Sequence, residues 1–471
     1  MEQRYDPEVK SLVFRVPGVR ALRLPLKMPA PSNPFSSALL LIYGFAGIIL
    51  LGTIFLIFPV SSTGGHFTSP ITALFSATSA ACVTGLVVVD TGTYWSTFGQ
   101  AVLLALFQIG GFGFITGATV ILLAIGGRFG LRERLAVSES MGLERTGGIL
   151  GIVIKIAIFS LIIEAAGAVI FYIRWLVVGE PGVSLWTAIF HAVSAFNNCG
   201  MDLFGNFNSM SAFRGDFPVI ITTVALTLLG STGYVVIMEY TRKKHFFKLS
   251  LDSKLVLFST LVLLILGTLF YLIAEYSSPV TLGPLSFPQK LLVAFFQSVT
   301  PRTAGFSAIN IGGLQQITLF FTMILMFIGG AAGSAAGGVK VNTVGILVLT
   351  VISVFRDRQG IEAFRRQITR LTVFRALAVV TSYLVVAGLI ITILSVTETF
   401  PIEKIMFETF SALSTVGLST GITPDLSIIG KFIITLSMFI GRLGPLVLMA
   451  YLVRRQRTVD IDYPQENIRI G

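Results

Sequence analysis

The chain has 471 residues, of which 54% are hydrophobic and 12% are charged. An ordinary soluble domain carries roughly 25% charged residues, so this composition excludes a soluble protein. The net charge is +11, and about 25 of the 34 lysines and arginines fall in five short stretches: residues 1–37, 126–148, 241–254, 356–375 and 454–471. Such clustering indicates the loops of a membrane protein rather than a nucleic-acid-binding surface, so we expect no nucleic-acid partner.

The five basic stretches also predict how the chain is oriented in the membrane. They fall on one side if each repeat crosses out and back, and the positive-inside rule makes that side cytoplasmic. We therefore expect a multi-pass protein of the cell inner (plasma) membrane with both termini cytoplasmic: an N-terminal tail over 1–37 and a C-terminal tail over 454–471. The two cysteines, Cys82 and Cys199, fit neither a disulfide framework nor a clustered metal site.

The first repeat, residues 38–125, predicts a spanning helix, a short re-entrant helix and a second spanning helix. The apolar runs 38–60 and 97–125 are long enough to cross the hydrocarbon core, whereas 70–82 is too short. Ser69 and Pro70 suit the start of that short helix, because proline is tolerated in the first helical turn. Non-helical backbone after it must be buried in protein or face water.

Three further repeats follow the same order, at 149–240, 252–355 and 370–453. In the third, the apolar stretch 315–355 would exceed 60 Å as one helix, about twice the thickness of the bilayer core. It must break, and the glycine-rich run 329–338 is the expected place. The other predicted helices cover 149–177, 184–197 and 217–240, then 252–276 and 287–301, and finally 370–396, 401–414 and 427–453.

A short pattern ending in glycine occurs once in each repeat. Its glycines, Gly85, Gly200, Gly305 and Gly417, recur at intervals of 115, 105 and 112 residues. A phenylalanine stands ten residues before each one, at Phe75, Phe190, Phe295 and Phe407. Self-similarity of this kind indicates one ancestral unit used four times. The four triplets are Val83-Thr84-Gly85, Asn198-Cys199-Gly200, Thr303-Ala304-Gly305 and Thr415-Val416-Gly417.

These triplets suit the binding of a cation by backbone oxygens. Consecutive carbonyls can replace the water shell of an ion without a fixed charge that would trap it. Glycine allows the positive φ that such a strand requires, and each short helix points its partly negative C-terminus at the ion. We therefore predict a cation site at the four triplets. The alternative is that the glycines are only close-packing points between membrane helices.

Two charged residues near this site have open roles. Arg302 precedes the third triplet, and we expect it to brace that triplet from behind or from its outer rim. Arg442 lies about 25 residues past Gly417, at the same depth as the break in the third repeat. It could raise a barrier to cations, hold the broken segment by its carbonyls, or only pack between helices.

Other chemistry is disfavoured. Gly111-Phe112-Gly113 lacks the strand and the acidic residue of a dinucleotide site, and the run from Gly333 to Lys340 departs from a phosphate loop. We expect no nucleotide to be bound by this chain. An intramembrane enzyme using His191, Asn197 and Cys199 is a minor alternative, because a Cys–His pair eight residues apart is not placed in contact on a short helix. We expect the protein not to be an enzyme.

At this point the sequence resembles the Trk/Ktr/HKT superfamily of potassium transporters. The likeness covers residues 38–455 and rests on the four triplets, on Gly337-Gly338-Val339-Lys340 in the third repeat and on Arg442 in the last helix. Only one spanning helix precedes the first triplet, as in Ktr-type membrane subunits (KtrB). Gly85 stands where some sodium-selective plant members have serine, so potassium selectivity is implied. Cys199 departs from the small residue expected at its position.

The resemblance implies an all-α integral membrane protein, with four helix–pore-loop–helix repeats in pseudo-fourfold arrangement around one potassium-channel-like pore. It implies a homodimer in the lipid bilayer, a cytoplasmic ring of nucleotide-binding regulatory subunits (KtrA-type) and, in some members, sodium as an activator. A stoichiometrically coupled Trk-type cation symporter is the alternative. The implied gate below the filter comprises Gly329, Gly330, Gly333, Ser334, Gly337, Gly338 and Lys340, with Arg442 as its basic neighbour.

Overall fold

The computed structural model describes residues 2–6, 11–15, 22–25, 34–113, 149–179, 184–358 and 360–444. The chain divides into two units, residues 1–37 and residues 38–471. The first unit contains three antiparallel strands in the order β1-β2-β3, in which Val13 pairs with both Arg4 and Arg23. The strands are β1 (Glu2–Asp6), β2 (Ser11–Arg15) and β3 (Leu22–Pro25). The prediction of a purely helical chain is therefore corrected to a mostly helical one.

The first group of helices in the larger unit follows the predicted order. Ser69 caps the short helix α2, because its hydroxyl accepts a hydrogen bond from the Thr72 amide at 3.3 Å. The predicted helix over 97–125 begins as expected but ends at Gly111, and residues 114–125 lie outside the described residues. The helices are α1 (Pro34–Ile57), α2 (Pro70–Ala81), α3 (Thr91–Tyr94) and α4 (Thr97–Gly111).

The second group contains a break that the sequence does not predict. A continuous helix over 217–240 is wrong: the chain turns by 96° between Ser231 and Tyr234. Gly233 lies between them at φ +88°, a conformation that no right-handed helix contains and that glycine adopts at little cost. The helices are α7 (Ile149–Val178), α8 (Leu185–Phe196), α9 (Phe217–Ser231) and α10 (Tyr234–Lys243).

The third group confirms the predicted break in 315–355. Helix α13 ends at Phe327 and α14 begins at Val341, so residues 328–340 connect them without helix. A short antiparallel hairpin, β4 (Ile361–Ala363) and β5 (Arg366–Ile368), follows α14. The helices are α11 (Leu251–Ala274), α12 (Phe287–Val299), α13 (Gln316–Phe327) and α14 (Val341–Phe355).

The fourth group closes the described chain. Arg442 was expected in the middle of a helix over 427–453, but the described helix ends at Leu443, with Gly444 at φ +86°. Residues 445–453 lie outside the described residues. The helices are α15 (Arg370–Thr397), α16 (Ile402–Leu413) and α17 (Ile428–Leu443). Short 3-10 turns occur at η1 (Pro59–Ser61), η2 (Ser211–Phe213), η3 (Phe246–Lys248) and η4 (Ile311–Gly313).

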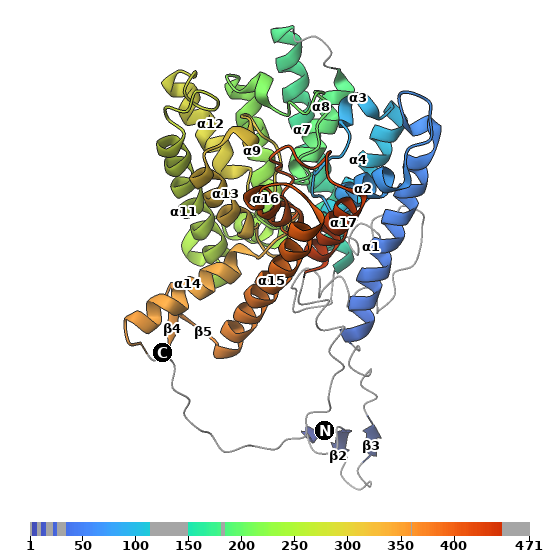
Figure 1. Ribbon diagram of the computed structural model, residues 1–471. Coiled ribbons are helices and arrows are strands. Elements are labelled where there is room, and N and C mark those ends of the chain that lie inside the picture. Colours follow the sequence, from blue (N-terminus) through green and yellow to red (C-terminus); the bar gives the residue numbers. More distant parts are fainter. Residues whose placement is uncertain are drawn as a thin grey trace. The chain divides into compact units, whose positions relative to one another are not determined.

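The four groups of helices pack on one another in a closed cycle (Figure 1). In each group the helix that follows the short helix packs on the short helix of the next group: α4 on α8, α9 on α12 and α13 on α16. Helix α17 of the fourth group packs on α2 of the first. Each short helix is therefore held by its own group and by the preceding group.

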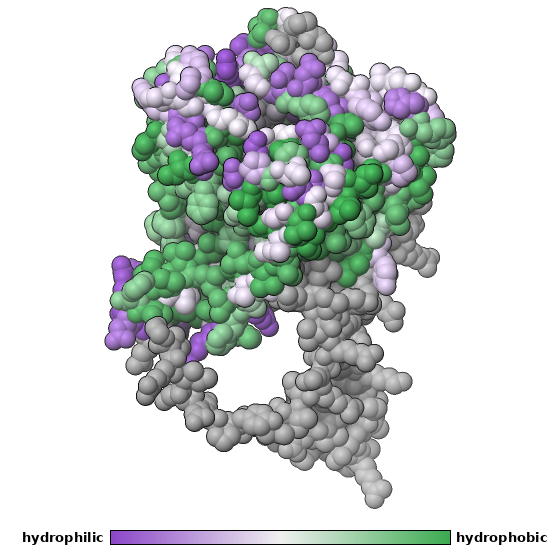
Figure 2. Space-filling view, viewed as in Figure 1, coloured by the Kyte–Doolittle hydropathy of each residue, from purple (hydrophilic) through white to green (hydrophobic). Residues whose placement is uncertain are grey.

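The surface of the larger unit fits a lipid environment. Among the described helices, three are long and apolar enough to cross a membrane, and the bent pair of α9 and α10 would be a fourth. The three are Gly151–Val178, Leu251–Ala274 and Arg370–Thr397. Figure 2 shows hydrophobic residues covering the middle of the visible face, with hydrophilic residues gathered toward its ends. Large apolar side chains such as Ile158, Leu266 and Leu389 are exposed, as expected for side chains that face lipid.

Candidate functional site

The four triplets have one backbone conformation although their sequences differ. The first and third residues of each triplet have positive φ, while the middle residue does not. For the first residues φ is 55° at Val83, 58° at Asn198, 70° at Thr303 and 51° at Thr415. For the glycines φ is 86° at Gly85, 79° at Gly200, 79° at Gly305 and 94° at Gly417. The shared conformation is imposed by the fold, because a positive φ is disfavoured for valine and threonine.

The amide of each middle residue is bonded to the preceding short helix. Thr84 donates to the Ser79 carbonyl at 2.7 Å, Cys199 to Ser194 at 2.8 Å, Ala304 to Thr300 at 2.9 Å and Val416 to Ser411 at 2.8 Å. These bonds turn the N–H groups back toward the helices. They leave the carbonyl oxygens of the triplets for another partner.

The triplets touch each other in a closed ring. A Cβ atom placed on Gly200 would lie 2.7 Å from the Ala304 carbonyl oxygen, and one on Gly305 would lie 2.6 Å from that of Val416. A Cβ on Gly417 would collide with the Thr84 carbonyl, and one on Gly85 with that of Cys199. The glycine of each group therefore abuts the middle carbonyl of a neighbouring group, and only glycine fits at these four positions.

The triplet carbonyls are a buried set of acceptors without donors. Thr84, Cys199 and Val416 are fully buried, and Ala304 is 2% exposed. Within the described residues, no hydrogen bond is donated to any carbonyl of the four triplets. Buried carbonyls are nearly always paired, so this ring of carbonyls needs a partner, which water or a ligand can supply. A cation that exchanges its hydration shell for carbonyl oxygens satisfies this requirement.

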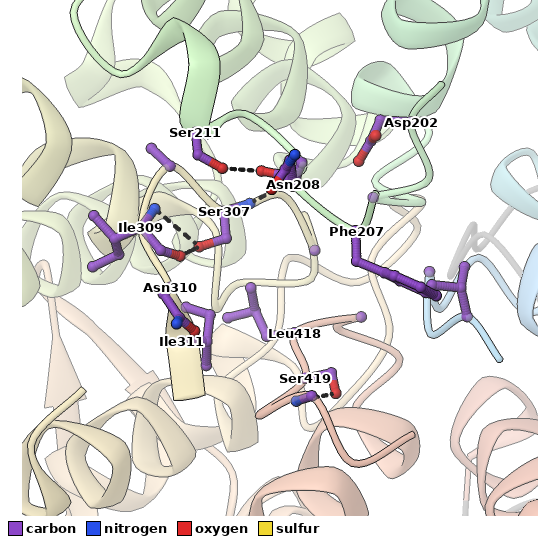
Figure 3. Close-up of a pocket in the computed structure, with 18 of the residues that line it drawn as sticks. Asp202, Phe207, Asn208, Ser211, Ser307, Ile309, Asn310, Ile311, Leu418 and Ser419 are labelled. Atoms are coloured by element: carbon purple, nitrogen blue, oxygen red, sulfur yellow. Dashed lines mark hydrogen bonds between the residues drawn. The ribbon is translucent and has the colours of Figure 1, made fainter. Parts of the chain in front are cut away.

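All four triplet glycines line one cavity of about 550 Å³. Figure 3 shows Asp202, Phe207, Ser307, Leu418 and Ser419 around it, from several groups of the chain. Two carboxylates, Asp90 and Asp202, and one guanidinium, Arg214, also line it. The sequence alone did not identify these carboxylates, because each is an isolated acidic residue in a loop.

The two carboxylates of the cavity differ in their surroundings. Asp90 accepts hydrogen bonds from the amides of Phe207 at 2.7 Å and Thr93 at 2.9 Å. Burial raises the pKa of Asp202 to about 6, opposed by a hydrogen bond from the Phe204 amide and reinforced by the negative charge of Asp90. Above that pH the cavity carries a charge that attracts cations.

Polar side chains hold the backbone beyond and behind the triplets. Glu408, which is buried on α16, accepts hydrogen bonds from Ser419 at 2.6 Å, from the Thr420 amide at 2.9 Å and from Thr423 at 2.8 Å. It fixes the loop after the fourth triplet. His191, at the equivalent position on α8, contacts the Thr223 hydroxyl at 3.2 Å among aromatic rings.

A second polar network joins the first and second groups. The Asn197 amide donates to Glu164 at 3.0 Å and to Gln108 at 2.8 Å, and Gln108 also donates to Glu164 at 3.1 Å. Asn197 ends α8, directly before the second triplet. The network was not predicted, since Glu164 and Gln108 lie on helices of different groups.

Arg302 lies behind the third triplet. Its side chain is 2% exposed, and its Nη2 donates to the Thr260 hydroxyl of α11 at 3.0 Å. It does not line the outer cavity. It therefore does not lie at the outer rim, and among the described residues it donates no hydrogen bond to the third triplet, so bracing from behind stays a prediction.

Residues 328–340, which we call the crossing segment, form a loop closed at its base. Gly329 donates to the Val339 carbonyl at 2.9 Å, and Val341 donates to that of Gly330 at 3.0 Å. Within the loop, the Ser334 hydroxyl donates to Ala331 at 2.7 Å, and Lys340 Nζ donates to the Ala336 carbonyl at 2.6 Å. A weakly helical, glycine-rich sequence is thereby held in one conformation.

The crossing segment touches the second and fourth groups. The amides of Ala331 and Ala335 donate to Ser231 at 2.9 Å and Gly230 at 3.2 Å, and Tyr234 donates to the Gly333 carbonyl at 3.3 Å. These bonds occupy the break between α9 and α10. On the other side, a Cβ on Gly337 would collide with the Thr415 hydroxyl, so the segment lies against the start of the fourth triplet.

Arg442 binds backbone carbonyls and no carboxylate within the described residues. Its guanidinium donates to the Ala335 carbonyl of the crossing segment and to the Gly110 carbonyl at the end of α4. Of the three roles expected from the sequence, these contacts support the hold on the broken segment: Arg442, on α17 of the fourth group, bonds both the crossing segment and the first group. Gly338, in the same segment, adopts φ +66°.

The residues of the enzyme hypothesis are not brought together. His191 is bonded to Thr223 and Asn197 to the Glu164 network. No contact joins the Cys199 thiol to the His191 ring among the interactions of the described residues. No group of three or more metal-ligating side chains occurs in the described chain either.

Two features described above are typical of membrane transport proteins for cations: apolar helices long enough to span a membrane, and a buried ring of carbonyls that receive no hydrogen bond from the described residues. A family model for TrkH, described as a cation transport protein, matches residues 48–458. The chain belongs to this family of cation transport proteins, which are not enzymes.

Individual relatives agree with this assignment. The chain is 40% identical to the Ktr system potassium uptake protein B of Bacillus subtilis, over 93% of this chain and 97% of the relative. It is 39% identical to the potassium/sodium uptake protein NtpJ of Enterococcus hirae, over 91% and 96% of the two chains. Its fold matches the crystal structure of the potassium transporter TrkH from Vibrio parahaemolyticus with a TM-score of 0.72 at 21% identity, covering 91% and 86%.

Proposed function

We propose that the chain takes up potassium ions across the cytoplasmic membrane, through a selectivity filter made of the carbonyls of its four triplets. One observation carries the proposal: buried triplet carbonyls form a closed ring and receive no hydrogen bond within the described residues. The cycle of helix packing supports a pseudo-fourfold arrangement of four repeats around one pore. The repeats are 38–125, 149–240, 252–355 and 370–453.

Potassium is the proposed substrate because of the site and the relatives. Carbonyl oxygens suit a large monovalent cation, because they can replace its water shell, which such an ion loses more readily than the smaller sodium ion does. Glycine ends all four triplets, and relatives named as potassium uptake proteins are about 40% identical to this chain. The relative from Enterococcus hirae is named for both potassium and sodium, which supports a role for sodium as well.

The crossing segment is the proposed gate. It lies against Thr415 at the start of the fourth triplet and is held by Arg442, so it is placed to obstruct the inner end of a pore through the ring. Its residues include Gly329, Gly330, Gly333, Ser334 and Lys340. Glycine-rich backbone orders weakly, so a small change in free energy could move it.

We further propose a homodimer that binds a cytoplasmic ring of nucleotide-binding regulatory subunits. The name of the Bacillus subtilis relative assigns that relative to a Ktr system, which supports a membrane subunit that works with others. The basic stretches at 241–254 and 356–375 support a cytoplasmic face that such a ring could contact. Both termini would lie on that face.

Uptake of potassium by cells that lack their own uptake systems tests the proposal. Expression of the parent chain should restore growth at low potassium, and purified protein in liposomes should carry potassium faster than sodium. Reversal potentials that follow the potassium gradient alone support a channel-like pathway. Potentials that shift with sodium or protons in a fixed ratio would establish the coupled symporter instead, and absence of any potassium flux would refute the proposal.

A further inference from the structure

A second cavity lies between α7 and α10, away from the triplets. Its volume is about 490 Å³. The apolar side chains of Ile156 and Phe159 on α7 face those of Ile237 and Met238 on α10 across it. None of the triplet glycines lines this cavity, so the ion pathway proposed above does not use it.

Two cations, Lys155 and Arg242, also line the cavity. Both are exposed, and neither forms a hydrogen bond or ion pair with another described residue. Nearby lysines differ: Lys243 pairs with Glu239 at 2.6 Å, and Lys254 donates to the Phe247 carbonyl at 2.8 Å. The cavity therefore combines apolar walls with two positive charges that have no described partner.

The position of the two cations suits the edge of the membrane. Arg242 lies in the last turn of α10, next to the charged run Lys243-Lys244-His245. Lys155 lies six residues after the start of α7, which is about 9 Å along the helix. A long lysine side chain at that depth can place its ammonium at the interface. Apolar walls below two interfacial cations match a phospholipid with acyl chains and an anionic phosphate.

We propose that an anionic phospholipid binds between α7 and α10, with its phosphate on Lys155 and Arg242 and an acyl chain along Ile156, Phe159 and Met238. The charge complementarity favours this occupant over a neutral lipid, since Lys155 and Arg242 have no carboxylate partner among the described residues. This proposal adds a lipid-binding site to the family assignment, and it holds whichever cation the protein transports.

The same cavity reaches the crossing segment through Tyr234. This residue lines the cavity and begins α10, and its amide donates to the Gly333 carbonyl at 3.3 Å. Val236, two residues further along α10, belongs to a buried cluster with Ala331 of the segment and with Val341, the first residue of α14. A lipid that ties α10 to α7 therefore restrains the helix on which the crossing segment rests, so it should also alter potassium flux.

Lipid retention by the purified full chain tests the binding site. The parent and the variant Lys155→Gln/Arg242→Gln are incubated with phosphatidylglycerol or with phosphatidylcholine of the same acyl chains, and bound lipid is measured by native mass spectrometry. The parent should prefer phosphatidylglycerol, and the double variant should bind it roughly 30-fold more weakly, since each of the two interfacial cations contributes about fivefold to fixing an anionic lipid. The matched control is Arg356→Gln/Arg358→Gln, two exposed cations that do not line the cavity.

Three outcomes would overturn the proposal. Equal retention of the two lipids by the parent shows that charge does not select the occupant, and equal retention of phosphatidylglycerol by parent and double variant shows that the two cations do not hold it. If inorganic phosphate displaces the headgroup from the two cations while the acyl chains of the lipid stay bound, the two cations form a site for free phosphate instead. Potassium flux in vesicles with and without phosphatidylglycerol gives a second readout: the parent should respond and the double variant should not, while both still conduct.

Discussion

At the scale of single residues, the triplet glycines carry the sharpest expectation. Gly85→Ser should reduce the preference for potassium over sodium about tenfold, because Gly85 has φ +86° and a Cβ there collides with the Cys199 carbonyl. A positive φ alone costs a side chain roughly 1–2 kcal/mol, which is about a factor of ten. Permeability ratios from reversal potentials in liposomes measure the effect.

A matched control at Gly388 separates an effect on the triplets from the general effect of replacing a glycine in a membrane helix. Gly388 lies on α15 with no atom within 4 Å of an added Cβ, so Gly388→Ser should leave selectivity unchanged. Comparable damage is expected from substitutions at Gly200, Gly305 and Gly417. Equal tolerance at all four triplets would leave only a packing role for these glycines.

Asp202 predicts a dependence of uptake on external pH. Its pKa of about 6, raised chiefly by burial, means that the carboxylate is mostly charged at pH 7.5 and mostly neutral at pH 5. Loss of that charge should raise the apparent KM for potassium by roughly two- to fivefold on acidification, because the cavity attracts cations less strongly. Initial uptake rates at low potassium, measured between pH 5 and pH 8, test this.

The variant Asp202→Asn should have, at every pH, the raised KM that the parent shows only at acid pH. Its KM should therefore no longer rise on acidification. Asp90 and Arg214 also line the cavity and remain unchanged in the variant. Asp425→Asn, at an exposed residue outside the cavity, should behave as the parent does. A pH profile that Asp202→Asn leaves intact would contradict the assignment.

At the scale of elements, the crossing segment predicts how flux is limited. Deletion of residues 331–336 removes the carbonyl that Arg442 binds but spares the bond between Gly329 and Val339 at the base of the loop. Flux should rise about tenfold, equivalent to a barrier lower by roughly 1.4 kcal/mol, while permeability ratios stay near those of the parent. Potassium flux into liposomes measures both quantities.

Arg442→Ala tests the same element without shortening the chain. It should raise flux in the same direction, since the crossing segment loses its bond to the fourth group and α4 loses the bond at Gly110. Arg442→Lys, which keeps the charge but not the two-armed geometry, separates an electrostatic barrier from a latch. If the variant that lacks residues 331–336 reaches the membrane and conducts no faster than the parent, the crossing segment is not a gate.

At the scale of the whole molecule, the distribution of charge predicts which side each loop faces. Arg365 is exposed in the hairpin of β4 and β5, and Asn206 is exposed in the loop before α9. An impermeant maleimide should label Arg365→Cys only from the cytoplasmic side and Asn206→Cys only from outside. The native cysteines, Cys82 and Cys199, are fully buried and should not react; the reverse pattern of labelling would invert the proposed topology.

The two breaks in the helices show where sequence reasoning succeeds. The break in the third group was predictable because 315–355 is too long for one span, which is an argument from length alone. The break in the second group was not, because 217–240 has the length of an ordinary span. Its cause is non-local: Gly233 must turn so that Tyr234 and Ser231 can bond the crossing segment.

The candidate site also has parts that the sequence predicts and parts that it does not. The triplets were predictable because one glycine recurs at similar intervals with a phenylalanine ten residues before it. The side chains around the triplets were not predictable. Glu164 bonds Gln108 and Asn197 across two groups, and Asp202 lines the cavity without belonging to any sequence motif. Contacts between groups leave no periodic signal in the sequence.

The cycle in which α17 packs on α2 has a consequence for biosynthesis. Helix α2 is made long before α17, so a nascent chain on the ribosome holds α2 without this neighbour until α17 has been synthesised. The carbonyl ring also lacks a quarter of its members until Gly417 has been synthesised and inserted. No selective passage through the bilayer can be complete before then, so the order of synthesis itself delays ion flow until the fourth triplet is in place.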